Sequence, residues 1–451
     1  MADQFRHDAL SANGGFANTP HLDAIASEGV LFNHCFTTSP KCIPARISLA
    51  LGHYPHQTGV WDNINFTLSP DAPTWMRAVR NAGYRTSVFG KTHLHPQRGD
   101  LREREPLLHA YGLDDVHEVA GPHSNASVQS YMTDLWEEHA VYSAYKDDIQ
   151  RRKQNRSEVR PSVLPLDLYY DVYVGRKSAE YLKAYDRPEP WMCWVSFPGP
   201  HDPWDAPPPY DTMYDPANMP LPIPAGKPDI ESDCVLKDLL ERPGQHRPHM
   251  TPEHVARLRA NYAGNVTLID DQIGMILDVL RTRGALDDTL VVFTSDHGEM
   301  NGDHGLLLKS NFLDPAVRIP FIVRPPRGFP SGMGDHHSAS LTEIIDVGAT
   351  LMDYAGAVVP TSFGGQSLRP LMEGRSYIPR TSIISEFKGE IMLADSSWKI
   401  VVDTQGRPVL LFDRVHDPDE LVNLADDLAN RETLQVLLAR LRQKCIPTER
   451  Y

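Results

Sequence analysis

Short apolar runs alternate with amphipathic stretches along the first three quarters of the chain. The runs 191–197 and 289–294 are almost continuously apolar and are bounded by turn residues, which is typical of strands buried on both faces. A Thr-Pro pair opens each of two amphipathic stretches, 20–27 and 252–284, and predicts a helix there because threonine caps a helix and proline suits its first turn. Further elements are predicted at 30–32 (strand), 74–82 (helix) and 86–89 (strand). This alternation predicts an α/β fold with a large, mainly parallel sheet flanked by helices.

The pattern changes after residue 372. Short apolar runs then follow one another at regular spacing and predict a small antiparallel sheet, with strands at 383–384, 391–393, 399–402 and 409–412. An amphipathic stretch at 431–444 predicts a terminal helix that packs on this sheet. We therefore divide the chain into a main domain, 1–372, and a C-terminal α+β subdomain, 373–451.

Polar side chains follow three of the predicted strands at the point where each strand ends. They are Lys91, His93, His201, Asp296 and His297. Ligands of parallel sheets bind beyond the carboxyl ends of the strands. We therefore expect these five side chains to converge on one site.

The segment Lys41–Arg46 (Lys-Cys-Ile-Pro-Ala-Arg) places a cysteine at the start of a predicted helix. Pro44 suits the first helical turn, where its missing N–H costs nothing. Arg46 lies four residues after Cys42, on the same helical face, and the helix N-terminus attracts anions. The segment predicts an anion site with a reactive side chain at its centre. The alternative is a cysteine buried as a small hydrophobic residue.

Composition narrows the class of partner and leaves the compartment open. The 451 residues carry a net charge of −15, which disfavours nucleic acid or an anionic membrane surface as a partner. No apolar run approaches the length of a membrane span, and no secretory signal is visible. The five cysteines are scattered without a Cys-x-x-Cys pair, so they indicate neither a disulfide framework nor a zinc site.

Motifs along nearly the whole chain resemble those of the sulfatase family, within the alkaline phosphatase superfamily. The first, Cys42-Ile43-Pro44-Ala45-Arg46, matches the family pattern Cys-x-Pro-Ser/Ala-Arg. The remaining matches are Thr19–Asp23, Glu28–Val30, Tyr54–Val60, Gly90–Leu94, Ser295–Glu299, Gly302–Gly305 and Lys309. The resemblance implies an alkaline-phosphatase-like α/β fold and makes 1–372 the catalytic domain.

The resemblance implies a particular chemistry for Cys42. A formylglycine-generating enzyme would oxidise Cys42 to formylglycine, and the hydrated aldehyde would attack the sulfur of a sulfate ester. The alcohol leaves first and sulfate is expelled afterwards, so one difficult step becomes two. The resemblance also implies one divalent cation, usually calcium, with Asp3, Gln4, Asp296 and His297 as its ligands. Because histidine is an uncommon calcium ligand, contact of His297 with the sulfate or the nucleophile oxygen is the alternative.

The resemblance further implies which side chains surround the sulfate. Arg46, Lys91 and Lys309 match the cations that stabilise the sulfate oxygens as charge develops. His201 matches a residue that binds sulfate or protonates the leaving alcohol, and His93 matches one that contacts the nucleophile. The implied substrate is a small sugar, alkyl or aryl sulfate.

The start of the chain departs from the family pattern. A hydrophobic strand normally precedes the metal-binding aspartate, whereas only Met1 and Ala2 precede Asp3 here. We therefore expect a central strand to be missing and the sequence to begin at an internal methionine. An aspartate at a frayed terminus would hold a metal poorly, so an N-terminally extended chain is expected to bind metal more tightly.

Two other functions stay open. Phosphonate monoester and phosphodiester hydrolases of the same superfamily share Pro-Ala-Arg, and Asp314-Pro315 with Arg318–Pro320 also resembles them. Lys91 and His93 fit the sulfatase pattern, so sulfate-ester hydrolysis is favoured. The other alternative is a non-catalytic anion-binding protein, which a missing first strand or an unconverted Cys42 would produce.

Overall fold

A three-stranded parallel sheet forms one half of the centre of the molecule. In the computed structural model, which describes residues 1–224, 233–241, 244, 246–327 and 336–445, β2 (Arg85–Gly90) lies between β4 (Asp115–Glu118) and β6 (Trp191–Ser196). Both pairs are parallel, in register from Ser87 with Asp115 and from Arg85 with Trp191. The chain crosses between these strands through long helical connections, as parallel pairing requires.

A five-stranded mixed sheet forms the other half. β1 (Val30–Phe36) pairs in parallel with β10 (His337–Glu343), but pairs antiparallel with β8 (Arg318–Ile319) and β9 (Phe321–Arg324). β9 also pairs antiparallel with β7 (Val291–Thr294). The expected mainly parallel sheet is therefore only partly confirmed. The connection from β7 to β9 contains no long crossover helix, so the chain returns in the opposite direction.

The first residues of the chain join the two sheets. Ala2 forms parallel bridges to Phe197, just after β6, and to Ser295, just after β7. Asp3 and Ala2 are both fully buried, so the expectation of a frayed terminus is wrong. Backbone hydrogen bonds to the residues at the ends of β6 and β7 hold Ala2 and Asp3 in position. Tighter metal binding by an extended chain stays a prediction.

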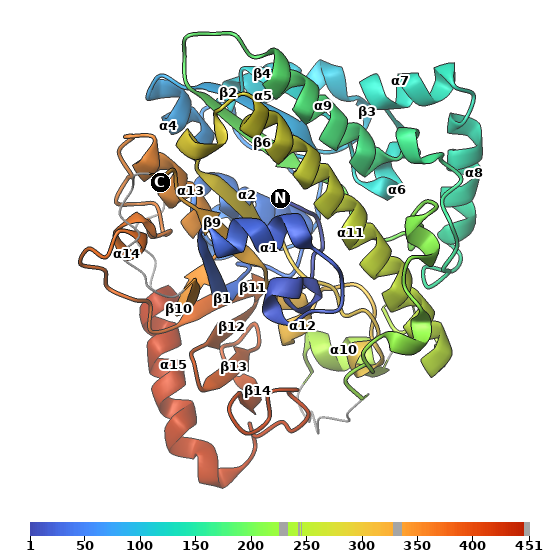
Figure 1. The fold of residues 1–451 in the computed structure, drawn as a ribbon. Coiled ribbons are helices and arrows are strands. Elements are labelled where there is room, and N and C mark those ends of the chain that lie inside the picture. The colour runs from blue at the N-terminus through green and yellow to red at the C-terminus, as the bar shows by residue number, and fades with distance from the viewer. Residues whose placement is uncertain (225–232, 242–243, 245, 328–335, 446–451) are drawn as a thin grey trace.

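Helices cover both faces of the joined sheets (Figure 1). One face carries α1 (Pro20–Ser27), α9 (Tyr170–Ala184) and α11 (Pro252–Thr282), and the other carries α2 (Cys42–Leu51), α4 (Trp75–Asn81) and α13 (Asp346–Tyr354). Successive residues of β9 show why two cores form. Ile322 packs among the first helices and Phe321 among the second, because neighbouring strand residues point to opposite faces.

Short elements between β2 and β6 build the rim of the molecule. They are β3 (Gly99–Asp100), α5 (Glu105–Ala110), α6 (Pro122–Asn125), β5 (Val128–Gln129), α7 (Tyr131–Glu138) and α8 (Tyr142–Arg152). Other short helices are α3 (Pro55–Thr58), α10 (Val235–Glu241), α12 (Asp314–Val317) and α14 (Arg369–Met372). Among the described residues, none of the helices combines the length and apolar character needed to cross a bilayer.

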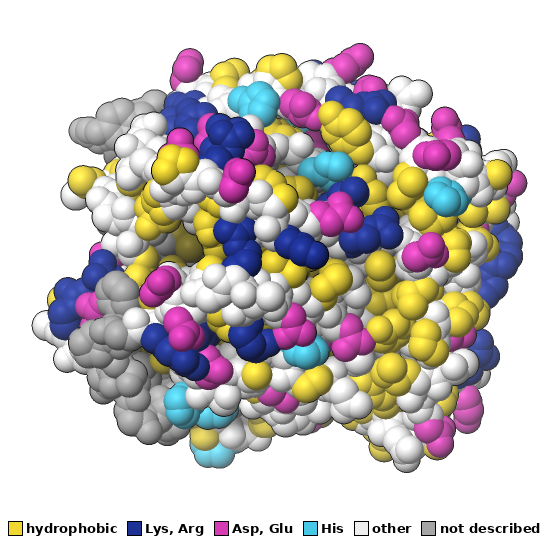
Figure 2. Space-filling model, turned by 45° about the horizontal axis from the view of Figure 1, so that its top comes forward, with side chains coloured by type: hydrophobic (Ala, Val, Ile, Leu, Met, Phe, Trp, Pro, Cys, Tyr) yellow, Lys and Arg dark blue, Asp and Glu magenta, His cyan; other side chains and the backbone are white. Residues whose placement is uncertain are grey.

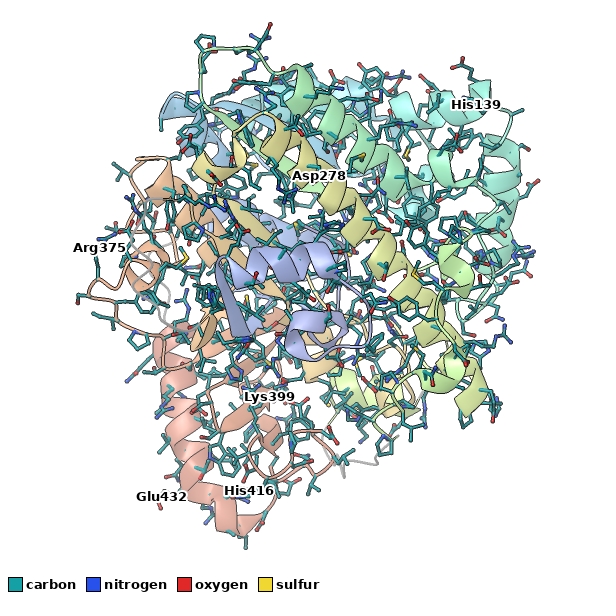
Figure 3. The ribbon with its side chains drawn as sticks, in the orientation of Figure 1. His139, Asp278, Arg375, Lys399, His416 and Glu432 are labelled. Carbon is teal, nitrogen blue, oxygen red and sulfur yellow. The ribbon has the colours of Figure 1, made fainter. Side chains whose placement is uncertain are left out.

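The C-terminal quarter forms the expected small antiparallel sheet with a terminal helix. Its strands pair in sequence order and are β11 (Ile383–Phe387), β12 (Glu390–Ala394), β13 (Trp398–Val402) and β14 (Pro408–Asp413). α15 (Arg431–Cys445) packs on one face through Leu437 and Leu441. Lys399 on β13 (Figure 3) donates to the Phe312 carbonyl at 2.9 Å and so ties this sheet to the main body. The boundary between 372 and 373 stays a prediction, and 446–451 lie outside the described residues.

Candidate active site

Cys42 is the first residue of α2, as the sequence predicts. Lys41 before it is extended, with φ −151°, so the helix begins abruptly at the cysteine. The Cys42 side chain is buried, and its Sγ lies 3.0 Å from Nε2 of His297. Helix and loop thus bring two predicted residues from distant parts of the chain into contact.

Two carboxylates and an imidazole surround the sulfur of Cys42. Ligand atoms of Asp3, Cys42, Asp296 and His297 all lie within 4.8 Å of one another, and all four residues are buried. Oδ1 of Asp3 has no hydrogen-bond partner although it is buried. Nδ1 of His297 lies 3.0 Å from the Gly298 carbonyl, which fixes the ring with Nε2 toward the site. An orphaned carboxylate oxygen beside oxygen and imidazole donors fits a divalent cation.

Gln4 lies between the carboxylates and the cationic side of the site. Its backbone N–H donates to Oδ1 of Asp296 at 3.1 Å, with Gln4 in the left-handed region at φ 67°. Its side-chain oxygen accepts a hydrogen bond from Lys309, and its amide nitrogen donates to Glu299. This orientation places the amide oxygen, the atom that would bind a cation, toward the site.

Arg46 lies behind the carboxylates, where its side chain is fully buried. Its Nε donates to Asp296 at 2.7 Å and one terminal nitrogen donates to Asp3 at 3.0 Å. The other terminal nitrogen donates to the Lys91 carbonyl at 2.7 Å and to Ser196 Oγ at 3.1 Å. The guanidinium therefore fixes both predicted metal-binding carboxylates. It is not among the residues that line the cavity described next.

A cavity of about 360 Å³ opens in front of Cys42. The predicted residues Lys91, His93, His201 and Lys309 all line it. The Lys91 ammonium donates to Asp3 at 2.5 Å, and the Lys309 ammonium lies 2.8 Å from Nε2 of His201. Nδ1 of His93 is buried without a partner. The sequence-predicted residues therefore converge around one small cationic pocket.

The two ammonium groups control the charge of the buried acidic groups. Burial alone would raise the pKa of Cys42, but Lys309 and Lys91 outweigh it and hold that pKa well below its usual value. Burial likewise opposes ionisation of Asp3, but Lys91 and Arg46 lower its pKa. The site therefore stabilises negative charge at the centre of the pocket.

Asp202 keeps His201 protonated. Burial and Lys309 both lower the pKa of His201, but the carboxylate of Asp202 outweighs them and raises that pKa to about 9. Oδ1 of Asp202 lies 3.0 Å from Nδ1 of His201. Near neutral pH, His201 therefore presents a positive charge and a transferable proton to the pocket.

Several pocket residues were missed by the sequence reasoning. They are Asp62, Asn63, Gln97, His123, Arg156 and His246, which line the cavity, together with Asp202 beside His123. His123 donates through Nε2 to Asp202 at 2.6 Å and follows the end of β4. The sequence of β4 is Asp-Val-His-Glu and contains no apolar run, so the hydrophobic pattern does not predict this edge strand. In the structure, His123 follows the carboxyl end of a parallel strand, as His201 does, and ligands of such sheets bind at these ends.

Buried ion pairs fix the loop that carries Lys309. The carboxylate of Asp303 accepts from Arg6 at 2.7 Å and also pairs with Arg259. Glu299 accepts from the backbone N–H of Asn301 at 2.9 Å. The loop after β7 is thereby tied to the N-terminal residues and to α11, which holds the Lys309 ammonium at the pocket.

Comparison with known proteins gives matches over nearly the whole chain. The model of the family "Sulfatase" matches residues 1–357, and that of "N-sulphoglucosamine sulphohydrolase, C-terminal" matches residues 302–446. An arylsulfatase of Clostridium perfringens is 30% identical over 97% of this chain and 91% of its own length. A choline-sulfatase of Rhizobium meliloti is 28% identical over 91% of this chain and 78% of its own length. The crystal structure of a phosphonate monoester hydrolase of Agrobacterium radiobacter has a TM-score of 0.77, with 27% identity over 98% of this chain and 94% of its own.

Proposed function

Because the chain belongs to the sulfatase family, we propose that this hydrolase cleaves a small sulfate monoester at Cys42. The observation that carries this proposal is the position of Cys42, at a helix N-terminus between an acidic cluster and a cationic pocket. The oxygens of a sulfate ester, a monoanion that is released as the sulfate dianion, need positive partners, and the pocket offers Lys91, Lys309 and protonated His201. The cavity volume of about 360 Å³ suits a small substrate.

The family generally uses formylglycine and a metal, and the residues present here fit both groups. Formylglycine in place of Cys42 would supply a hydrated aldehyde as nucleophile, and calcium held by Asp3, Gln4, Asp296 and His297 would supply positive charge beside it. The orphaned Oδ1 of Asp3, and the position of the His297 ring within the same cluster, support this ligand set.

The remaining residues bind, orient and move protons. Lys91 and Lys309 bind the sulfate oxygens, and the protonated His201 gives a proton to the leaving alcohol. His93, whose pKa is lowered by burial and by Lys91, is neutral and accepts a proton from the nucleophile. Arg46 orients the two carboxylates through its direct bonds to them.

The proposed function is tested by comparing two substrates with the same leaving group. We expect the matured enzyme to hydrolyse 4-nitrophenyl sulfate with a kcat/KM at least about tenfold above that for 4-nitrophenyl phenylphosphonate. The physical reason is that Lys91, Lys309 and protonated His201 match the three non-bridging oxygens of a sulfate ester, whereas a phosphonate ester has two such oxygens and an apolar group in the third position. A clear preference for the phosphonate would contradict the proposal.

That outcome would support the second candidate, a phosphonate monoester hydrolase. The likeness to the solved phosphonate monoester hydrolase favours this candidate, and Pro-Ala-Arg at 44–46 is compatible with it. Absence of turnover on both substrates, with an intact thiol at Cys42 in a host that makes formylglycine, would support the non-catalytic alternative.

The pair of Asp202 and His201 predicts a shift in the pH profile. Because Asp202 raises the pKa of His201 to about 9, the wild-type kcat/KM should fall as pH rises through about 9. In Asp202→Asn, the carboxylate that opposes burial and Lys309 is removed, so this fall should move to lower pH by about 1 to 3 units. The pH dependence of kcat/KM measures the shift.

A matched control is Asp147→Asn, at an exposed aspartate on α8. This control should keep the wild-type profile. An unshifted alkaline limb in Asp202→Asn would show that the proton of His201 does not limit turnover.

A further inference from the structure

The leaving alcohol of a bound sulfate ester has to extend toward the His201 side of the pocket. This step rests on the proposed function, in which protonated His201 gives its proton to the leaving oxygen. The ring of His123 lies 6.1 Å from that of His201, measured between centroids. Nη1 of Arg156 lies 3.5 Å from Oδ2 of Asp202, the carboxylate that both histidines contact. His123 and Arg156, which both line the cavity, therefore border the space for the alcohol.

The backbone of Arg156 is held by the loop that carries His201. The indole N–H of Trp204, a buried side chain of that loop, donates to the Arg156 carbonyl at 2.9 Å. Val159 forms a parallel bridge with Trp204, and the Arg160 N–H donates to the Trp204 carbonyl at 3.2 Å. Because the loop orders this backbone before any ligand binds, less conformational entropy is lost when Arg156 contacts a substrate.

Arg156 carries more positive charge than its surroundings neutralise. Among the described residues its carboxylate partner is Asp202, which is also the partner of protonated His201. His123 is neutral, because burial lowers its pKa. Nε of Arg156 is buried without a hydrogen-bond partner in the described part of the chain, and the side chain as a whole is 25% exposed. One carboxylate thus faces two cations, which leaves this wall of the pocket with a surplus positive charge.

The other cations of the pocket are engaged elsewhere. Lys91 and Lys309 bind the sulfate in the proposed reaction, and Lys41 donates to Ser310 at 3.0 Å and is close to the negative charge of Asp62. Figure 2 shows Lys and Arg side chains interspersed with Asp and Glu on the face that it presents. A surface of mixed sign does not concentrate anions. Discrimination between alcohols by their charge is therefore expected inside the pocket, at Arg156.

We propose that Arg156 is a specificity-determining residue and that the leaving alcohol carries a carboxylate, which the guanidinium binds. The planar donors of arginine match the two oxygens of a carboxylate. A carboxylate is also small enough to share a cavity of about 360 Å³ with the sulfate and a small alcohol. A neutral alcohol would leave the surplus charge unpaired, and a cationic alcohol would be repelled. The substrate class is therefore the sulfate ester of a small hydroxy acid.

The test measures binding separately from turnover, in the full chain with Cys42→Ala. The probes are 3- and 4-carboxyphenyl sulfate, each compared with its carbamoyl analogue, which has a similar shape and no charge on that group. In calorimetric titration the better carboxylate probe should bind at least about tenfold more tightly than its amide. Adding Arg156→Gln should reduce this ratio to below about threefold, and Arg156→Lys should give an intermediate ratio because lysine keeps the charge without the planar donors.

The matched control is Arg187→Gln, at an exposed arginine between α9 and β6, which should keep the ratio. Equal affinity for acid and amide, or a preference that persists in Arg156→Gln, would overturn the proposal. If Arg156→Gln does not fold, the ratio has to fall by at least about threefold in Arg156→Lys, and an unchanged ratio there overturns the proposal. The proposed function fails separately, if the matured enzyme does not hydrolyse 4-nitrophenyl sulfate, which has no carboxylate.

Discussion

Replacing Cys42 by alanine is expected to lower kcat with 4-nitrophenyl sulfate by at least about 10⁴-fold, because the substitution removes the proposed nucleophile while leaving the pocket in place. The side chain is buried at the first position of α2, where alanine is compatible with the helix. Lys91, His201 and Lys309 keep their positions, so inorganic sulfate should still bind. Steady-state kinetics and sulfate titration measure the two effects.

The matched control is Cys35→Ala, which removes another buried thiol from β1. This variant should lose some stability and keep most of its turnover. Mass spectrometry of the wild-type peptide that contains Cys42 should find an aldehyde in a host that makes formylglycine. Turnover by Cys42→Ala within tenfold of wild type would contradict the assigned role of Cys42.

Strand ends explain why much of the site could be predicted from the sequence. The apolar runs at 191–197 and 289–294 were clear, and polar residues directly after them had to lie at one edge of a sheet. His201 and Asp296 were found in this way, and the structure brings both to the region of Cys42. The helix that begins at Cys42 could be predicted equally well. Its two signals, the proline in the first turn and the i, i+4 spacing of Cys42 and Arg46, depend only on neighbouring residues.

Features that depend on distant contacts could not be predicted in the same way. The antiparallel direction of β9 follows from how its connection packs, which no local pattern records. His123 was missed because β4 is an edge strand without an apolar run. Asp202 was adjacent to His201 in the sequence, but its effect on the pKa of that histidine depends on burial of the pair. The burial of Asp3 likewise depends on strands almost 200 and 300 residues away.

The buried charges of the site show what the proposed cation would contribute to both structure and activity. Arg46 satisfies one oxygen of Asp296 and one of Asp3, and Lys91 shares the latter. Oδ1 of Asp3 is left without a partner in a buried place, which is costly unless a cation is bound there. We therefore expect the substitution of a metal-binding carboxylate to weaken metal binding. Turnover should fall as a consequence.

Asp296→Asn is expected to weaken calcium binding by at least about 10²-fold, because it removes one of two negative charges from the proposed ligand set while keeping the size of the side chain. The hydrogen bond from Arg46 to Oδ2 of Asp296 would then have a neutral acceptor. Less of the positive charge of Arg46 would therefore be compensated by its neighbours. Turnover should fall with metal occupancy and recover in part at high calcium. Calorimetric titration of chelator-treated protein measures the affinity, and elemental analysis measures the bound metal.

The matched control is Asp278→Asn, the same substitution on the exposed face of α11 (Figure 3). Its pairing with Arg281 lies at the surface, so calcium affinity and turnover should stay at wild-type values. Chelator treatment of the wild-type protein should reproduce the loss of turnover seen in Asp296→Asn, and added calcium should reverse it. Full activity after removal of all bound metal would contradict the proposed site, because Asp3 and Asp296 would then act only as partners of Arg46 and Lys91.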